Sequence, residues 1–364
     1  MECFEKRRWN KYTREELYSI RIEKPSEEWY EKVQKKWDSI AKPLDSMGDF
    51  ERLFAKIGAI TGTTKLDITK KAVIIMCADN GIVEEGVSQS GKEVTAAVAR
   101  NMVRRQSSVG KMAAVLGADT IPVDIGINQK EPIIGMVQRK IRYGTANFRK
   151  EPAMTEEETI QAIFTGIEMI ADCKEKGYQL LATGEMGIGN TTTSSAIATA
   201  MLDCEVAELT GRGAGLSDSG LSKKRQVIEE ALEKYQLRGA DALRILSTVG
   251  GLDIAGLVGV CIGGAMHHVP IVLDGVISLV AALVAEKLLP GVKDYLLPSH
   301  MGKEPAIKRL MEALDLKPVI YAGLALGEGT GAVMMFSLLD MANAVYQESS
   351  TFEEIEVEQY KRVE

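Results

Sequence analysis

The chain of 364 residues is 45% hydrophobic, which is enough for one large buried core, although its length alone allows two or three domains. Its net charge of −7 argues against nucleic acid or an anionic membrane surface as the main partner and favours small-molecule substrates. The five cysteines have no Cys-x-x-Cys spacing and indicate neither a disulfide framework nor a zinc knuckle. Residues 1–8 are charged and lack the apolar core of a signal peptide, so we expect a cytoplasmic protein.

The first 60 residues predict two amphipathic helices, over 26–40 and 48–60. The first of them contains Trp29, Tyr30 and Trp37. No short β-branched run occurs in this part of the chain. We therefore expect the two helices to pack as an accessory helical layer beside the main core.

Beyond residue 60, short β-branched apolar runs alternate with longer helical patterns, which is typical of parallel β-α-β units. These patterns predict an α/β fold whose sheet is mostly parallel. The predicted strands, in chain order, span residues 72–78, 120–125, 179–183, 269–274 and 318–322.

Capping signals delimit two of the helices. Thr155 and Glu158 form a capping box, which predicts a helix from there to about Lys176, before Gly177. Ser222 precedes a second predicted helix over 223–235, in which Glu230 and Lys234 stand at the i,i+4 spacing of a helical ion pair.

The most apolar region, 254–285, is interrupted by polar residues and a proline, so it contains no span of about 20 residues that suits a membrane. We interpret it as a buried helix, a strand and another buried helix. After Gln347 the chain is charged and has no strand signal, and we expect a terminal helix or a frayed end.

Polar groups follow the predicted strands at 79–81, 184–185, 274–275 and 327–328. Open parallel sheets bind ligands at the carboxyl ends of their strands. A single Asp-Gly or Asn-Gly after a strand is more often plain turn chemistry. We therefore interpret Asp274 first as a structural or helix-capping residue and leave both interpretations open for Asp79.

The glycine loop 184–189 has the spacing Gly-x-x-Gly-x-Gly, which is neither the dinucleotide fingerprint nor a P-loop. A helix opened by Asn190, Thr191 or Thr192 would follow, and its N-terminus suits a phosphate. A second glycine cluster, 211–218, contains Arg212 and precedes Lys223-Lys224-Arg225. Phosphate or carboxylate binding is one interpretation of this cluster, and a solvated helix start is the other, which we prefer for Lys223 and Arg225.

Several segments together resemble the nicotinate-nucleotide:dimethylbenzimidazole phosphoribosyltransferase family, which assembles the lower ligand of cobalamin. Their order and spacing match over roughly residues 30 to 350. The segments are Ala78-Asp79-Asn80-Gly81-Ile82-Val83-Glu84-Glu85-Gly86-Val87, Gly184-Glu185-Met186-Gly187-Ile188-Gly189-Asn190-Thr191-Thr192, Val249-Gly250-Gly251, Val272-Leu273-Asp274-Gly275, Ser299-His300 and Leu326-Gly327-Glu328-Gly329-Thr330-Gly331-Ala332.

The resemblance implies transfer of phosphoribose from nicotinate mononucleotide to 5,6-dimethylbenzimidazole, giving α-ribazole 5′-phosphate and nicotinate. It also implies a Rossmann-like large domain over 61–334, with a mostly parallel sheet flanked by helices. A small helical accessory domain would be assembled from both chain ends, 1–60 with 335–364. The family further implies a homodimer, with no cofactor and no metal.

By resemblance Glu328 is the general base, and Glu185 and Lys224 occupy the other polar active-site positions. His300 is the one histidine that we expect at the cleft. Leu324, Leu326, Met334 and Met335 are candidates for pocket wall, although the two methionines at helix spacing are more often core. The implied substrate-binding residues are Asp79, Asn80, Val83, Gly184, Gly187, Gly189, Asn190, Thr191, Gly213, Asp274, Ser299, His300 and Leu326.

The chain departs from the family pattern at two positions. Asn80 stands where the family commonly has His, and Lys92 stands where Gln is often found. Both segments would border the pocket for the aromatic base that receives phosphoribose, so the identity of this aromatic base stays open. One alternative is a paralogue that activates a purine, a phenol or another benzimidazole. The other is a non-catalytic nucleotide-binding protein, which would not need Glu328 and Glu185 together.

Overall fold

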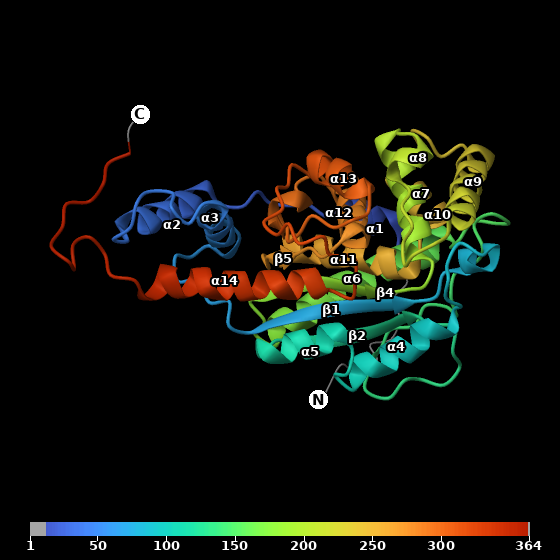
Figure 1. Cartoon of the computed structure of the whole chain (residues 1–364), viewed down its shortest axis with the longest axis horizontal. Coiled ribbons are helices and arrows are strands. Elements are labelled where there is room, and N and C mark those ends of the chain that lie inside the picture. Colours follow the sequence, from blue (N-terminus) through green and yellow to red (C-terminus); the bar gives the residue numbers. More distant parts are fainter. Residues whose placement is uncertain (1–11, 363–364) are drawn as a thin grey trace.

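The computed structural model describes residues 12–362, so residues 1–8 and Cys3 of the sequence predictions lie outside the described part (Figure 1). Its centre is a six-stranded sheet in which every neighbouring pair of strands is parallel, in the order β3-β2-β1-β4-β5-β6. This order confirms the Rossmann-like α/β prediction. The strands are β1 Lys71–Ala78, β2 Asp119–Gly126, β3 Val137–Gln138, β4 Leu180–Met186, β5 Ile271–Val272 and β6 Leu296–Leu297.

The long strands β1, β2 and β4 and the short strand β5 were predicted, whereas β3 and β6 were not. The predicted strand 269–274 reduces to β5, and β3 and β6 lack enough residues to give a pattern. The predicted strand 318–322 is wrong. There only Ile320 forms an isolated parallel bridge, with His300. Pro318 donates no backbone hydrogen bond, and the chain beyond it continues as an exposed loop.

Helices cover both faces of the sheet (Figure 1). The alternate residues Ile74 and Met76 of β1 face a core shared with α6, α7 and α9 to α13, and Val73 and Ile75 face a core shared with α2 to α5 and α14. The helices are α1 Arg14–Ser19, α2 Glu27–Ser39, α3 Asp49–Thr61, α4 Glu93–Val103, α5 Ser108–Val115, α6 Glu156–Glu175, α7 Asn190–Leu202, α8 Val206–Leu209, α9 Asp218–Tyr235, α10 Ala242–Val249, α11 Leu252–Met266, α12 Val276–Leu288, α13 Ala306–Leu314 and α14 Thr330–Glu348, with 3₁₀ turns at Gly81–Glu85 and Val292–Tyr295.

The predicted capping box of α6 is confirmed. Thr155 Oγ1 accepts from the Glu158 N–H at 3.1 Å, and the Glu158 carboxylate accepts from the Thr155 N–H at 2.9 Å. The start predicted for α9 is wrong, since the helix is capped by Ser217 and begins before Ser222. The glycine-rich sequence ahead of it hides this start. Lys234 donates to two backbone carbonyls instead of pairing with Glu230.

The apolar region 254–285 is confirmed as a buried helix, a short strand and a buried helix, namely α11, β5 and α12. Close packing of α11 on α6 depends on glycine, because a Cβ on Gly259 would lie 1.8 Å from the carbonyl oxygen of Ile163. Among residues 12–362, no helix combines the length and apolarity needed to cross a membrane.

The two amphipathic helices predicted near the N-terminus are confirmed as α2 and α3. They lie beside the C-terminal half of α14 (Figure 1). Trp37 is fully buried there, with its ring centroid 5.7 Å from Phe54 and 5.0 Å from Tyr346. This aromatic cluster is continuous with the core on one face of the sheet. The division into 1–60 with 335–364 and 61–334 stays a prediction.

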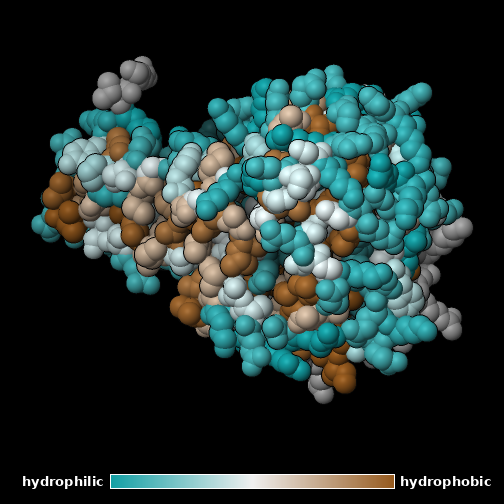
Figure 2. All heavy atoms as spheres, turned by 45° about the vertical axis from the view of Figure 1, so that its right-hand side comes forward, coloured by the Kyte–Doolittle hydropathy of each residue, from teal (hydrophilic) through white to brown (hydrophobic). Residues whose placement is uncertain are grey.

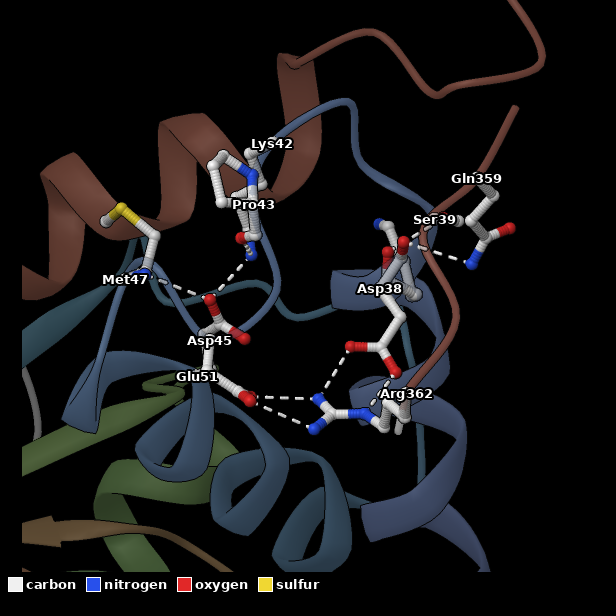
Figure 3. Close-up of polar contacts among 10 residues, drawn as sticks. Asp38, Ser39, Lys42, Pro43, Asp45, Met47, Glu51, Gln359 and Arg362 are labelled. Atoms are coloured by element: carbon white, nitrogen blue, oxygen red, sulfur yellow. Dashed lines mark hydrogen bonds and ion pairs between the residues drawn. The ribbon is translucent and has the colours of Figure 1, made fainter. Parts of the chain in front are cut away.

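The C-terminal tail is neither a further helix nor frayed, because it is tied to the loop between α2 and α3 (Figure 3). Thr351 bridges Ile40 in antiparallel fashion. The Arg362 guanidinium contacts the carboxylates of Asp38 and Asp45 at 2.8 and 2.9 Å. Polar side chains and turns hold this segment, and they leave no helical or strand periodicity in the sequence.

Candidate active site

A cavity of about 290 Å³ lies at the carboxyl ends of β4, β5 and β6. Its walls come from the loops that follow these strands, from the loop before α14 and from two glycine-rich segments. This is the edge where open parallel sheets bind ligands, beside the switch point between β1 and β4. Of the predicted site residues, those that line the cavity are Glu185, Gly187, Gly189, Asn190, Thr191, Gly213, Asp274, His300, Leu326 and Glu328.

The other predicted site residues do not line the cavity. Asp79 accepts from the Asn128 N–H at 2.7 Å, which favours its structural interpretation. Ser299 donates to the Leu273 carbonyl at 2.6 Å, and Gly184 lies behind the Glu328 backbone. The remaining residues contact residues of the wall but do not line the cavity themselves, and they are Asn80, Val83 and Lys224.

Met334 and Met335 are also absent from the wall, because they begin the second turn of α14. Met335 is fully buried in the core and Met334 is partly exposed on the outer side of the helix. Leu324 and Leu326 do line the cavity, as predicted.

The turn from β4 into α7 forms part of the cavity wall. Gly189 caps α7 with φ +94°, a conformation that favours glycine. A helix N-terminus of this kind suits an anion. Lys224 lies behind the turn and donates to Thr191 Oγ1 at 3.0 Å and to the Gly211 carbonyl at 3.1 Å. Burial lowers the pKa of Lys224 to about 8.

Asn190 links two carboxylates at the base of the cavity. Its side-chain Nδ2 donates to Glu185 and, at 3.1 Å, to Asp253. Burial raises the pKa of Glu185 to about 8 and that of Asp253 to about 6. The sequence analysis missed Asp253, although it is the one acid in the first turn of the otherwise apolar α11.

Glu328 has φ +61° between two glycines that also have positive φ. Its carboxylate is half-buried and accepts from the Val109 N–H, at the start of α5, at 3.4 Å. Burial is the main cause that raises the pKa of Glu328, and the nearby Asp274 adds to it. The loop brings Glu328 next to Glu185, since a Cβ on Gly327 would lie 2.6 Å from Glu185 Oε1.

Asp274 caps α14, as the helix-capping interpretation predicted. Its carboxylate accepts from the N–H groups of Gly329, Gly331 and Ala332 at 3.0, 2.8 and 3.2 Å. The cap fixes the start of the helix that follows Glu328. Asp274 therefore positions the base loop even though it also lines the cavity.

His300 is held in one tautomer. The Ser299 hydroxyl donates to the Leu273 carbonyl, so its oxygen accepts from His300 Nδ1–H at 2.9 Å. Burial lowers the pKa of His300 and favours the neutral ring. Nε2 is then an acceptor at the cavity wall, where a hydroxyl of a bound sugar can donate to it.

Sequence reasoning also missed part of the wall. The unpredicted polar members include Ser88 and Gln89, which follow the first 3₁₀ turn, Ser278 in α12, and Lys303 and Glu304, which follow His300. Glu304 accepts from the Gly213 N–H at 3.0 Å and so joins two loops of the site. The nearness of 303–304 to His300 in the chain was the one signal that could have indicated them.

The phosphoribosyltransferase family matches residues 22–357 of the chain. The curated nicotinate-nucleotide–dimethylbenzimidazole phosphoribosyltransferase of Acetivibrio thermocellus is 45% identical over 329 residues, which are 90% of this chain and 94% of the relative. The chain belongs to this family. The enzyme of the same name from Ruminiclostridium cellulolyticum is 44% identical, over 93% of this chain and 96% of the relative.

A solved phosphoribosyltransferase of this family has the same fold. The crystal structure of CobT from Thermus thermophilus superposes with a TM-score of 0.86 at 35% identity, covering 92% of this chain and all of that one. The resemblance stated from the sequence motifs is therefore confirmed at the level of family and fold.

Proposed function

We propose that the protein transfers phosphoribose from nicotinate mononucleotide to 5,6-dimethylbenzimidazole, giving α-ribazole 5′-phosphate and nicotinate for the lower ligand of cobalamin. The observation that supports this most directly is a single cavity that joins Glu328 and Glu185 with the glycine turn at the start of α7. Incubation of the protein with both substrates should release free nicotinate. Absence of nicotinate and of a ribosylated base would contradict the proposal.

The chemistry explains why the site needs a base. In nicotinate mononucleotide the leaving pyridine is already a cation, so nicotinate departs without a general acid. The attacking benzimidazole nitrogen becomes positively charged, and the proton on the other ring nitrogen must be lost to neutralise the product. Glu328 is the proposed acceptor of this proton, because its raised pKa improves its strength as a base.

The remaining roles follow from the placement of the side chains. The N–H groups at the start of α7 would bind the phosphate, with Thr191 held in place by Lys224. His300 Nε2 would accept from the ribose. Glu185 would lie near the anomeric carbon. Because burial raises the pKa of Glu185 to about 8, its carboxyl oxygens stabilise positive charge in the transition state by their dipole at neutral pH and by a full negative charge above that pKa.

A non-catalytic nucleotide-binding protein is the weaker alternative. Such a protein needs an anion site but has no use for two carboxyl groups with raised pKa values in one cavity. A paralogue with another base remains the closer alternative. Segment 80–87 is predicted to form part of the rim of the pocket for the aromatic base. Only Val87 of this segment lines the cavity, and Lys92 does not line it either.

We expect benzimidazoles to be preferred over adenine by at least about tenfold in kcat/KM. Apolar residues of the cavity wall include Val87, Val98, Ile188, Leu324 and Leu326. Each polar edge of adenine left unpaired there costs about 1–3 kcal/mol, and about 1.4 kcal/mol corresponds to a tenfold change. Phenols lack the attacking ring nitrogen and should react more slowly still. Competition of 5,6-dimethylbenzimidazole, adenine and p-cresol in one vessel, read by mass spectrometry, measures this, and a dominant adenine or cresol product would favour the paralogue.

We also expect activity to persist after exhaustive chelation, because a cationic leaving group needs no Lewis acid. Among residues 12–362 no group of three or more His, Cys, Asp or Glu side chains is placed to hold a metal ion. Nicotinate release with and without EDTA is the measurement. A loss of activity in EDTA that a divalent ion restores would contradict the expectation.

We further propose a cytoplasmic homodimer. Its support is a set of exposed apolar side chains, Met341 on α14 and Tyr321 and Leu326 on the loop before it, which are 59%, 71% and 55% exposed. Figure 2 shows hydrophobic side chains gathered on the part of the surface where α14 lies. Leu326 also lines the cavity, so a second copy on this surface would border the site. The mass of a single chain in light scattering would contradict the dimer.

The proposed cytoplasmic location is supported by the cysteines. Cys77, Cys173, Cys204 and Cys261 are free thiols, which suits a reducing compartment.

A further inference from the structure

The structure contains a buried acid that lies behind the cavity wall and accepts a hydrogen bond from one of its side chains. We propose that Asp253 is a positioning residue, which fixes the direction of the Glu185 carboxylate through the side-chain amide of Asn190. This inference rests on the proposed function, because it concerns how the same cavity performs phosphoribosyl transfer. It concerns a residue that lies outside the cavity wall.

The bridge uses the whole donor capacity of one amide nitrogen. Asn190 Nδ2 has two protons, and its contacts are one oxygen of Glu185 and, at 3.1 Å, Oδ2 of Asp253. The amide therefore cannot also donate to the phosphate of a substrate. Asn190 was predicted to bind substrate, and its contacts favour a role in holding Glu185 instead.

Asp253 is itself held rigidly. It is fully buried in the first turn of α11. Gly187 and Gly251 pack directly against its carboxylate, since a Cβ on either would lie 2.3 Å from Oδ2 or 2.4 Å from Oδ1. The Asn80 side chain lies against the same face of Gly251. A carboxylate so enclosed has little freedom to move, and it restricts the amide that contacts it.

This restriction matters because Glu185 has no other side-chain donor among the described hydrogen bonds than Asn190. Its second oxygen lies on the side of Gly327, next to the loop of the proposed base. If the amide were released, the Glu185 side chain could rotate away from the sugar. A misplacement of about 1 Å at a reacting centre can cost up to about 10²-fold in rate, and we expect about tenfold for a partial release.

The test is a double-mutant cycle in kcat for nicotinate release. Asp253→Ala should lower kcat about tenfold in the wild-type background, with KM for nicotinate mononucleotide changed less than about twofold. In the Glu185→Gln background the same change should lower kcat less than about twofold. Asp253→Asn keeps a side-chain oxygen that can accept from Asn190, and it should recover most of the activity.

Asp124→Ala is the matched control. Asp124 is equally buried, accepts from the Ile127 N–H and pairs with Lys140, but it does not contact the cavity. Its loss should reduce thermal stability and leave kcat per folded molecule unchanged. If Asp253→Ala does not fold, the cycle is made with Asp253→Asn and Asn190→Ala instead. Asp253→Asn should then lower kcat slightly in the wild-type background and not at all in the Asn190→Ala background, because the bridging amide is absent there.

The outcomes separate the two claims. A wild-type protein that releases no nicotinate would overturn the proposed function and this inference with it. Equal losses from Asp253→Ala with and without Glu185→Gln, in an enzyme that is active, would overturn the role of Asp253 alone. Non-additive losses with rescue by Asp253→Asn would establish it.

Discussion

Glu328→Gln should lower turnover by about 10²–10⁴-fold while the affinities for both substrates change little. The amide keeps the size of the side chain and its place in the loop, but it cannot take the proton that the benzimidazole loses. Because burial raises the pKa of Glu328 above its usual 4.5, the wild-type pH profile should have an acid limb above that value. The limb falls as the pH decreases through the pKa, since only the deprotonated form accepts a proton, and it should vanish in the variant.

Glu286→Gln provides the control for Glu328→Gln. Glu286 also accepts from backbone N–H groups, those of Gly291 and Lys293, and it lies outside the cavity. Steady-state kinetics with both substrates should separate the two variants by at least two orders of magnitude in kcat. Near-normal turnover of Glu328→Gln would refute its assignment as the base.

Gly189→Val should raise the Kd for nicotinate mononucleotide about a hundredfold and the Kd for benzimidazole less than about twofold. Valine at φ +94° is strained, and its Cβ would lie 2.8 Å from a methyl carbon of Val83. Strain of this kind costs about 1–3 kcal/mol, and the turn can relieve it only by moving the N–H groups that would bind the phosphate. Calorimetric titration of each substrate measures the two effects separately.

Gly177→Val is the control for the effect of backbone strain at a position outside the cavity. Gly177 has φ +81° after α6, and nothing lies within 4 Å of a Cβ placed there. Its substitution should lower the melting temperature and leave both Kd values unchanged. Equal weakening of both substrates by Gly189→Val would indicate general misfolding and contradict the assignment of an anion site.

Sequence patterns predicted the elements that are long or locally encoded. β1, β2 and β4 are strands of seven or eight residues that contain apolar stretches, and the α6 capping box is a four-residue signal that needs no tertiary context. β5 and β6 have only two residues each, so their place is decided by the neighbouring strand and not by their own sequence. Segment 318–322 has the composition of a strand, but Pro318 and the exposed loop beyond it prevent pairing.

The same distinction applies to the site. Glu185, Gly189 and Glu328 stand in glycine-rich turns, whose composition is visible in the sequence. Asp253 is invisible in this way, because it looks like an ordinary acid in the first turn of a helix, and its partner Asn190 is 63 residues away. Lys224 shows the opposite case. Its sequence position predicted a site residue, but burial places it behind Thr191 instead of in the cavity wall.

The packing of α2 and α3 against α14 has a consequence for synthesis of the protein. Tyr346 donates to the Thr64 carbonyl, 282 residues away, in the same region where it packs on Trp37. At about 5–20 residues per second, a ribosome needs roughly 15–55 s to make the intervening chain. During that time α2 and α3 have left the ribosome while the apolar face that receives α14 stays uncovered. This end of the molecule therefore completes its folding only after α14 and Arg362 have been made and are free to dock on α2 and α3.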